Sequence, residues 1–390
     1  MTEPTIERAF LLDALTRYVA TNSVNPAFSN GSTDESALAA VVARDLEEAG
    51  LEVRTVSAAP GRDSVVGTLT GRGGGRSLML YAHLDTVSPG EMAAPFEPTV
   101  RDGKLFGRGA YDMKAGLASC VAVARAAASL DRRLAGDVVV VGAADEEAAS
   151  IGMQAVLEEV RVDGAIVTEP TELDLCLAHK GFAWYRVTTH GRAAHGSRFD
   201  QGVDANLRMG RFLGRLEALE RSLRAHPEPH PHVGPPSLHA ATIRGGAGPS
   251  IYADRCELQI ERRLMPGETA DAALDELAAL LRALETEDDS FHADIELLLA
   301  RDSFECRPDS ELALVLASAW KRVTGSRPGR SGRPSWMDAA LLAAAGVDTV
   351  VFGAAGAGAH ADVEWVDLAS VERHAEVLLD ATLAYTGSSV

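Results

Sequence analysis

Short apolar runs that alternate with helical patterns constrain the fold of this chain more than any other feature. Ser64–Leu69, Ser77–Ala82, Asp137–Ala143 and Ala165–Thr168 are largely apolar, and an alanine-rich helical stretch, Met113–Leu130, separates the second run from the third. Strands that are buried on both faces have this composition, and parallel strands need such helical connections. The sequence therefore predicts an α/β domain with a mainly parallel sheet.

The pattern changes at Lys180. Between residues 180 and 300, strand-like runs and two helical patterns follow in the order βαββαβ, which is typical of a ferredoxin-like α+β sandwich. After Arg301 the helical and strand patterns return to the style of the first part. We therefore predict one α/β domain made of residues 1–179 and 301–390, interrupted by an inserted α+β domain of residues 180–300.

Composition narrows the kinds of partner. Lys and Arg total 37 against 56 Asp and Glu, a formal charge of -19, and such a surface repels phosphate backbones and anionic lipids. The N-terminus lacks a basic flank followed by an apolar run, no stretch reaches eighteen apolar residues, and the four cysteines form no CxxC pair. We expect a cytoplasmic protein with neither a nucleic-acid nor a membrane partner.

The run LMLYAHLDTV brings two polar side chains to the end of a predicted strand, His83 and Asp85. Ligands of open α/β sheets bind at the carboxyl ends of strands. Because side chains alternate along a strand, these two share a face, and Asp85 can orient or polarise the imidazole. Taken alone, the pair is more typical of an ordinary polar strand end.

Carboxylates follow three other predicted elements. In LFGRGAYDMKAG a glycine-rich turn leads to Asp112, which can be a helix N-cap or can bridge two cations. The strand VVVGAA ends in three consecutive acids, which are either a solvated loop or a group neutralised by cations or protons. If cations neutralise these acids, Glu147 is the candidate metal ligand and Glu146 the candidate base.

Two more candidates complete the set. Glu169 follows the strand AIVT, and His360 lies in a glycine-rich loop after the predicted strand Asp348–Phe352. Two imidazoles and three carboxylates from separate strand ends suit two zinc ions that share a bridging ligand. The predicted ligands are His83, Asp112, Glu147, Glu169 and His360.

The runs YAHLDTV, GRGAYDMKAGLA, DEEAASIG, TEPT and HADVEWV resemble the metal-site motifs of the acetylornithine deacetylase, succinyl-diaminopimelate desuccinylase, aminoacylase and glutamate carboxypeptidase family. The resemblance extends over nearly the whole chain and implies a zinc-peptidase-like catalytic domain, in which cobalt or manganese can replace zinc. It implies one zinc held by His83, Asp112 and Glu169, and another held by Asp112, Glu147 and His360. It also implies that Asp85 supports His83 and that Glu146 is the general base.

The inserted domain is similar to the lid and dimerisation domain of that family. The run THGRAAHGSRFDQGVDAN resembles its helix-entry motif, which implies a homodimer in which His195 donates to the oxyanion in the partner's active site; the alternative is a surface histidine on a turn. Arg263, in ERRLMPGET, stands where the family has an arginine that clamps a substrate carboxylate. Asp204, where many members have Asn, is a further candidate for substrate binding.

These residues predict metal-dependent hydrolysis of an amide bond. The phrase LAHKGFAWYRVTTHGRAAHGSRFD is most similar to acetylornithine deacetylase-like members, so we expect the substrate to be a small N-acyl amino acid. A di- or carboxypeptidase that acts on short peptides and a carbamoyl-cleaving amidohydrolase are alternatives within the same chemistry. A protein that binds a peptide or amide without catalysis is the alternative of another class.

Overall fold

The structure is a computed structural model that describes residues 4–387, and it divides into two compact units. The first unit consists of the segment that ends at Leu177, Cys306–Ser331, and the segment that starts at Met337; the second consists of Ala178–Glu305 and Gly332–Trp336. No helix among the described residues is both long and apolar enough to cross a membrane. Each unit is described by itself below.

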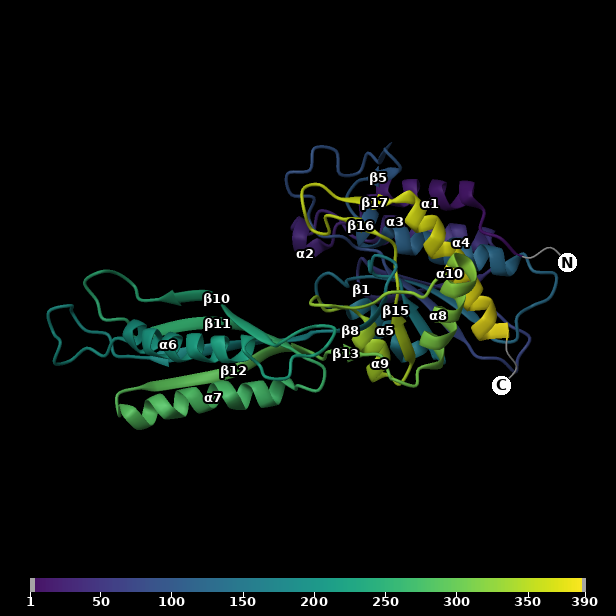
Figure 1. The fold of residues 1–390 in the computed structure, drawn as a ribbon. Coiled ribbons are helices and arrows are strands. Elements are labelled where there is room, and N and C mark those ends of the chain that lie inside the picture. Colours follow the sequence, from purple (N-terminus) through teal and green to yellow (C-terminus); the bar gives the residue numbers. More distant parts are fainter. Residues whose placement is uncertain (1–3, 388–390) are drawn as a thin grey trace. The chain divides into compact units, whose positions relative to one another are not determined.

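A large mixed sheet forms the centre of the first unit (Figure 1). Its strands follow the order β1 (Glu52–Ala59), β2 (Arg62–Leu69), β6 (Val138–Ala143), β3 (Leu78–His83), β7 (Gly164–Val167), β15 (Asp348–Val351) and β8 (Leu175–His179). Two further short strands, β13 (Phe304–Glu305) and β14 (Arg330–Arg333), lie at the points of the chain where the division into units falls. The four strands from β6 to β15 are parallel. The predicted α/β class with a mainly parallel sheet is confirmed.

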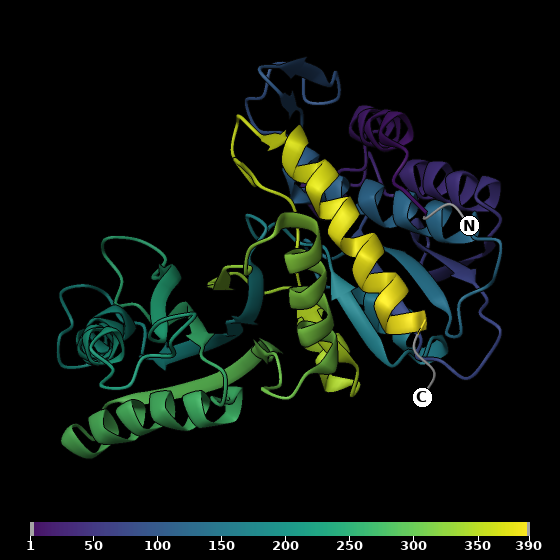
Figure 2. The same cartoon turned by 45° about the vertical axis from the view of Figure 1, so that its right-hand side comes forward.

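Helices cover both faces of this sheet, which is why β3 and β6 are buried at every residue. A Cβ on Gly67 of β2 would meet Leu46 of α3 (Ser36–Glu48), whereas Ser64 of the same strand lies against Gly152 of α5 (Ile151–Glu159). Positions 64 and 67 point to opposite faces of a strand. The other helices of this unit are α1 (Arg8–Ala20), α2 (Pro26–Ser29), α4 (Ala115–Ala128), α8 (Glu311–Thr324), α9 (Ala339–Ala344) and α10 (Leu368–Gly387), and Figure 2 shows α10 beside α8.

A second, small sheet in the first unit was not predicted. Its order is β16 (Gly356–Ala357), β17 (Trp365–Asp367), β5 (Lys104–Phe106) and β4 (Thr99–Arg101). In it Val366 pairs with Leu105, so the loop after β15 lies beside the segment that leads to Asp112. These strands are too short for periodicity to reveal them.

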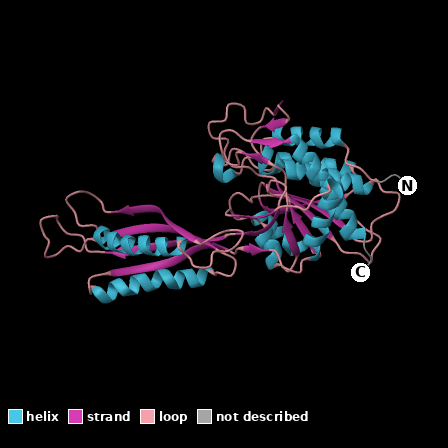
Figure 3. Ribbon diagram, viewed as in Figure 1, coloured by secondary structure: helices cyan, strands magenta, loops and turns pink. Residues whose placement is uncertain are grey.

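The second unit is a four-stranded antiparallel sheet covered by two helices (Figure 3). Its elements are β9 (Gly181–His190), α6 (Ala205–Arg224), β10 (Ser237–Gly245), β11 (Arg255–Leu264), α7 (Ala270–Glu287) and β12 (His292–Arg301), with strand order β10-β11-β9-β12. Tyr185, Phe212 and Leu277 belong to the core between sheet and helices. The predicted order βαββαβ is confirmed.

Candidate metal centre

Parallel strands bring three of the predicted segments to one edge of the large sheet. His83 is the last residue of β3, and it pairs with Ala143, the last residue of β6. The acidic loop, Asp145–Glu147, begins two residues later, and Glu169 follows the end of β7 by two residues. Because β3 lies between β6 and β7, the two segments flank His83.

Asp112 lies in an irregular turn, Ala110–Lys114, immediately before α4. The sequence suggested that Asp112 starts the helix, but its φ of -115° and ψ of 95° are not helical, and α4 begins at Ala115. A helix N-cap accepts hydrogen bonds from the helix that follows. The carboxylate of Asp112 instead faces two imidazoles.

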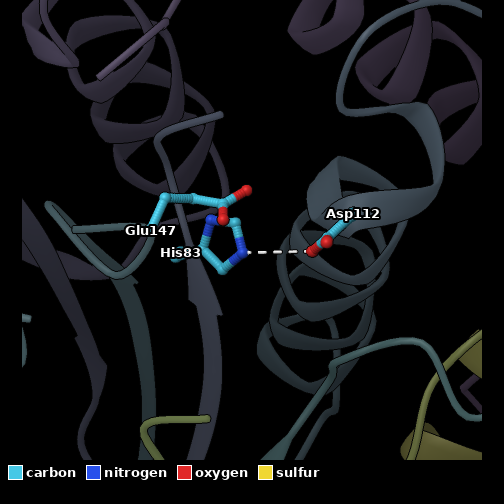
Figure 4. Close-up of side chains that lie close together, drawn as sticks. All are labelled: His83, Asp112 and Glu147. Carbon is cyan, nitrogen blue, oxygen red and sulfur yellow. Dashed lines mark hydrogen bonds and ion pairs between the residues drawn. The ribbon is translucent and has the colours of Figure 1, made fainter. Parts of the chain in front are cut away.

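The two oxygens of Asp112 face different histidines. Its Oδ1 lies 3.3 Å from Nε2 of His83, and its Oδ2 lies 3.4 Å from Nε2 of His360. Figure 4 shows the first of these contacts, with Glu147 beside His83. This is the arrangement expected of a carboxylate that bridges two sites.

Further carboxylates flank each imidazole. Glu169 Oε1 lies 3.5 Å from Nε2 of His83, and Glu147 Oε2 lies 3.0 Å from Nε2 of His360. Possible metal-ligand atoms lie within 4.8 Å of one another in two overlapping groups: His83, Asp112 and Glu147, and His83, Glu146 and Glu169. The predicted ligands therefore come together, and the candidate base, Glu146, lies among them.

The electrostatics of this cluster are those of crowded acids. Burial raises the pKa of Glu146, and Glu169 raises it further. Burial also raises the pKa of Glu169 and of Glu147, to both of which Asp112 adds repulsion. Hydrogen bonds to Asp112 and Glu147 raise the pKa of His360 to about 10. These shifts have the signs that close packing of carboxyls with imidazoles produces.

The residues present fit divalent cations. A buried group of carboxylates is costly unless positive charge neutralises it. Burial disfavours the charged form of His83, but the acids around His83 and His360 raise the pKa of both imidazoles, so their protonation is one source of that charge. Cations would supply the same compensation while the imidazoles become neutral ligands. Imidazole nitrogens and carboxylate oxygens are also the ligand types of zinc sites.

The side chain of Asp85 holds the backbone of the acidic loop. It is fully buried, and its oxygens accept hydrogen bonds from the backbone N–H groups of Glu146 (3.1 Å) and Glu147 (3.0 Å). Its Oδ1 also lies 3.5 Å from Nδ1 of His83, whose closer contact is the backbone oxygen of Asp85 at 2.9 Å. Asp85 therefore supports both His83 and the loop.

Glu364 does the same for Asp112, and the sequence did not reveal it. Its Oε1 accepts from the backbone N–H groups of Tyr111 (2.9 Å) and Asp112 (3.0 Å). Its Oε2 accepts from the N–H of Gly109 (2.9 Å) and from Nη1 of the buried Arg108 (2.7 Å). Glu364 lies in the run HADVEWV, four residues after His360, and this position was the one feature of the sequence that could have pointed to a role at the site.

A second unpredicted contact lies behind the site. The Tyr81 hydroxyl, from the strand that ends in His83, donates to Oδ2 of Asp338 at 2.5 Å. Both side chains are buried, and burial raises the pKa of Asp338 to about 6. This pair ties β3 to the start of α9.

Three predicted site residues lie in the second unit. His195 is exposed, and its Nδ1 lies 2.8 Å from the Ser197 hydroxyl. Asp204 is the N-cap of α6, accepting from the backbone N–H groups of residues 206 and 207 at 2.9 and 3.3 Å. Arg263 donates to Glu261 at 2.7 Å. Their roles toward substrate stay predictions.

Comparisons with known proteins identify the family of this chain. Residues 79–384 match the sequence profile described as Peptidase family M20/M25/M40. An acetylornithine deacetylase of Myxococcus xanthus is 29% identical over 350 residues, which cover 88% of this chain and 87% of that protein. An acetylornithine deacetylase of Salmonella arizonae is 30% identical over 309 residues, covering 76% and 79%.

Solved structures show the same fold. A tripeptidase from Staphylococcus aureus superposes with a TM-score of 0.82 at 19% identity and covers 98% of this chain and 100% of its own. A Bacillus subtilis protein described as a dinuclear metal binding peptidase has a TM-score of 0.74 at 14% identity, with coverage of 98% and 99%. At these identities the likeness concerns the fold alone.

Proposed function

Because this chain belongs to Peptidase family M20/M25/M40 and is a hydrolase, we propose that it cleaves the amide bond of a small N-acyl amino acid with two metal ions. Zinc is the proposed metal, with cobalt or manganese as substitutes. His83, Asp112 and Glu169 would hold one ion, and Asp112, Glu147 and His360 would hold the other.

One observation carries this proposal: the two oxygens of Asp112 face the imidazoles of His83 and His360 on separate sides. Neither capping a helix nor facing solvent requires an aspartate to contact two histidines from distant segments. Glu169 beside His83 and Glu147 beside His360 give each half of the site a third donor. The arrangement supports two cations with a shared ligand.

Two bound divalent cations would polarise the scissile carbonyl and make a water molecule more acidic. Glu146 is the proposed base: its carboxylate removes a proton from the attacking water and then passes it to the leaving nitrogen. The raised pKa of this buried carboxyl, caused by burial and by Glu169, suits both steps because the group can accept and release a proton. Asp85 orients Glu146 through the backbone N–H.

The substrate class rests on the relatives. Both relatives described above are named acetylornithine deacetylase, which supports an N-acyl amino acid. Arg263 is the proposed clamp for the substrate carboxylate, since a guanidinium can bind a carboxylate through two hydrogen bonds. Asp204 is a further proposed substrate contact, in addition to its capping role.

The proposal includes a homodimer in the cytoplasm. His195 of one subunit is proposed to donate to the oxyanion in the other, a task for which an exposed imidazole N–H is suited. All four cysteines are buried thiols, which supports a reducing compartment.

Substrate profiling of metal-loaded protein tests the function. Metal-free protein is supplied with none, one or two equivalents of zinc or cobalt and is offered N-acetyl amino acids, dipeptides and N-carbamoyl amino acids. We expect free amino acid and acetate from the first class. Faster cleavage of dipeptides would make the protein a peptidase, and release of ammonia and carbon dioxide would make it a carbamoyl hydrolase. Binding without any hydrolysis would contradict the proposal.

A further inference from the structure

A fully buried amide, that of Asn25, lies behind the candidate metal centre and contacts two of its supporting carboxylates. Its Nδ2 donates to Oδ2 of Asp85 at 2.8 Å and to Oδ1 of Asp145 at 3.0 Å. Its Oδ1 accepts from the backbone N–H of Ala27 at 2.9 Å and from Nη2 of Arg62 at 3.0 Å. Both donors and both acceptor positions of this amide are therefore used.

The two carboxylates enclose the residues that are proposed to do the chemistry. Asp85 accepts from the backbone N–H groups of Glu146 and Glu147, and Asp145 directly precedes them in the chain. Asp145 has a φ of 70°, and its backbone oxygen accepts from the N–H of Ser150 at 2.6 Å, so it sets the turn of the acidic loop. The conformation of the acidic loop therefore depends on both residues.

Arg62 completes the arrangement with a positive charge. Its Nη2 lies 3.1 Å from Asp145 Oδ1, and its Nη1 lies 2.5 Å from Oε1 of the buried Glu35. Without these donors, Asp85 and Asp145 would be two buried carboxylates with fewer hydrogen bonds, a costly state. The amide of Asn25 donates to both carboxylates, so one side chain holds them together.

We propose that Asn25, supported by Arg62, is a positioning residue that holds Asp85 and Asp145 together and thereby fixes Glu146 and Glu147 at the metal centre. The proposal rests on the proposed two-metal function. A carboxylate or a hydroxyl at position 25 cannot replace the amide, because neither offers two N–H donors to the two acids. Residues that hold metal ligands in place without touching the metal change metal affinity and activity by roughly 10- to 100-fold when they are replaced.

The alternative is that Asn25 only stabilises the fold as the N-cap of α2. Asn25→Asp separates the two roles, because a carboxylate still accepts from Ala27 and Arg62 but loses both donors and adds a negative charge beside Asp85 and Asp145. Asn25→Ser removes the donors without adding charge. Thr33→Val is the matched control: it removes a hydroxyl that donates to Val24 at 2.8 Å and touches neither carboxylate.

The test measures kcat and KM on the best substrate, the unfolding temperature, and cobalt affinity followed by its visible absorption. We expect Asn25→Asp to lower kcat per folded molecule by roughly 10- to 100-fold with little change in KM, and to weaken cobalt binding by a similar factor. Asn25→Ser should show a smaller loss in the same direction. Thr33→Val should lower the unfolding temperature but keep kcat and cobalt affinity.

Two outcomes would overturn the proposal: wild-type kcat and cobalt affinity in both Asn25 variants, or an equal loss in Thr33→Val at a similar unfolding temperature. If Asn25→Asp does not fold, Asn25→Ser decides between these results. If the wild-type protein binds two cobalt ions but cleaves no substrate, the proposed function fails, and the cobalt affinities still decide the role of Asn25.

Discussion

Replacement of Glu364 by glutamine should loosen the loop that presents Asp112. The carboxylate now accepts four hydrogen bonds, from the backbone N–H groups of Gly109, Tyr111 and Asp112 and from Nη1 of Arg108. A glutamine oxygen can keep two of them. The glutamine NH₂ group would face the other N–H donors, with which it cannot bond.

The size of the effect follows from the pair with Arg108. Both side chains are almost fully buried and lie 2.7 Å apart, so glutamine leaves a buried guanidinium without its counter-charge. Breaking a buried pair by removing one partner costs about 3–5 kcal/mol. For a unit of this size, we expect the unfolding temperature to fall by roughly 10 °C. Because Asp112 loses its anchor, metal affinity should fall by roughly 10- to 100-fold.

The assay compares thermal unfolding of metal-free protein with zinc affinity measured by chelator competition. Glu376→Gln is the matched control, because this glutamate of α10 is 55% exposed and its contact with Arg373 is long, at 4.0 Å. Such a change should cost less than about 0.5 kcal/mol of unfolding free energy. An unfolding temperature and zinc affinity equal to wild type would refute the reasoning. Lower stability with unchanged zinc affinity would show that Glu364 does not position Asp112.

Three further predictions concern Glu146, His374 and His195. Glu146→Gln should keep both metal ions, measured by elemental analysis, yet lower kcat by roughly 10²–10⁴-fold because it removes the base; near wild-type turnover would reject that role. Burial lowers the pKa of His374 to about 4, so the unfolded chain takes up a proton that the folded chain refuses. The free energy of unfolding should therefore fall by roughly 3 kcal/mol in total as pH drops from about 6.5 to 4. Urea titrations at several pH values should show no such fall for His374→Gln; an equal pH dependence of the unfolding free energy in both proteins would contradict the prediction. Mixing the His195→Ala and Glu146→Gln proteins should restore roughly a quarter of wild-type activity, since half of the dimers are mixed and each mixed dimer has one intact site out of two. If no activity returns after verified subunit exchange, His195 does not act between subunits.

Much of the fold could be predicted because its signals are local. The buried strands β3 and β6 are apolar at nearly every position, and the strands and helices of the second unit have clear periods of two and about 3.6 residues. Strand β1 escaped prediction because most of its residues are exposed or half-exposed, which leaves no apolar run. The short pairs β16–β17 and β4–β5 depend on partners far away in the chain.

The candidate site divides in the same way. His83, Glu147 and Glu169 could be proposed because they follow buried strands, and parallel strands end at one edge. Asn25 could not be proposed, because Asn followed by Pro is typical of many helix starts. Its significance lies in hydrogen bonds to residues 60 and 120 positions later.

The sequence by itself determined which chemical groups stand at the ends of which strands, because hydrophobic periodicity and strand polarity are properties of neighbouring residues. Only the tertiary structure decided what the carboxylate of Asp112 contacts. As one aspartate after a glycine-rich turn, it could equally have capped a helix. The contacts of its two oxygens with His83 and His360, and the hold of Glu364 on its backbone from 252 residues away, exist only once the chain has folded. Contacts of one carboxylate with two distant segments are a property of the folded chain, whereas the sequence alone left both the capping and the bridging role open for Asp112.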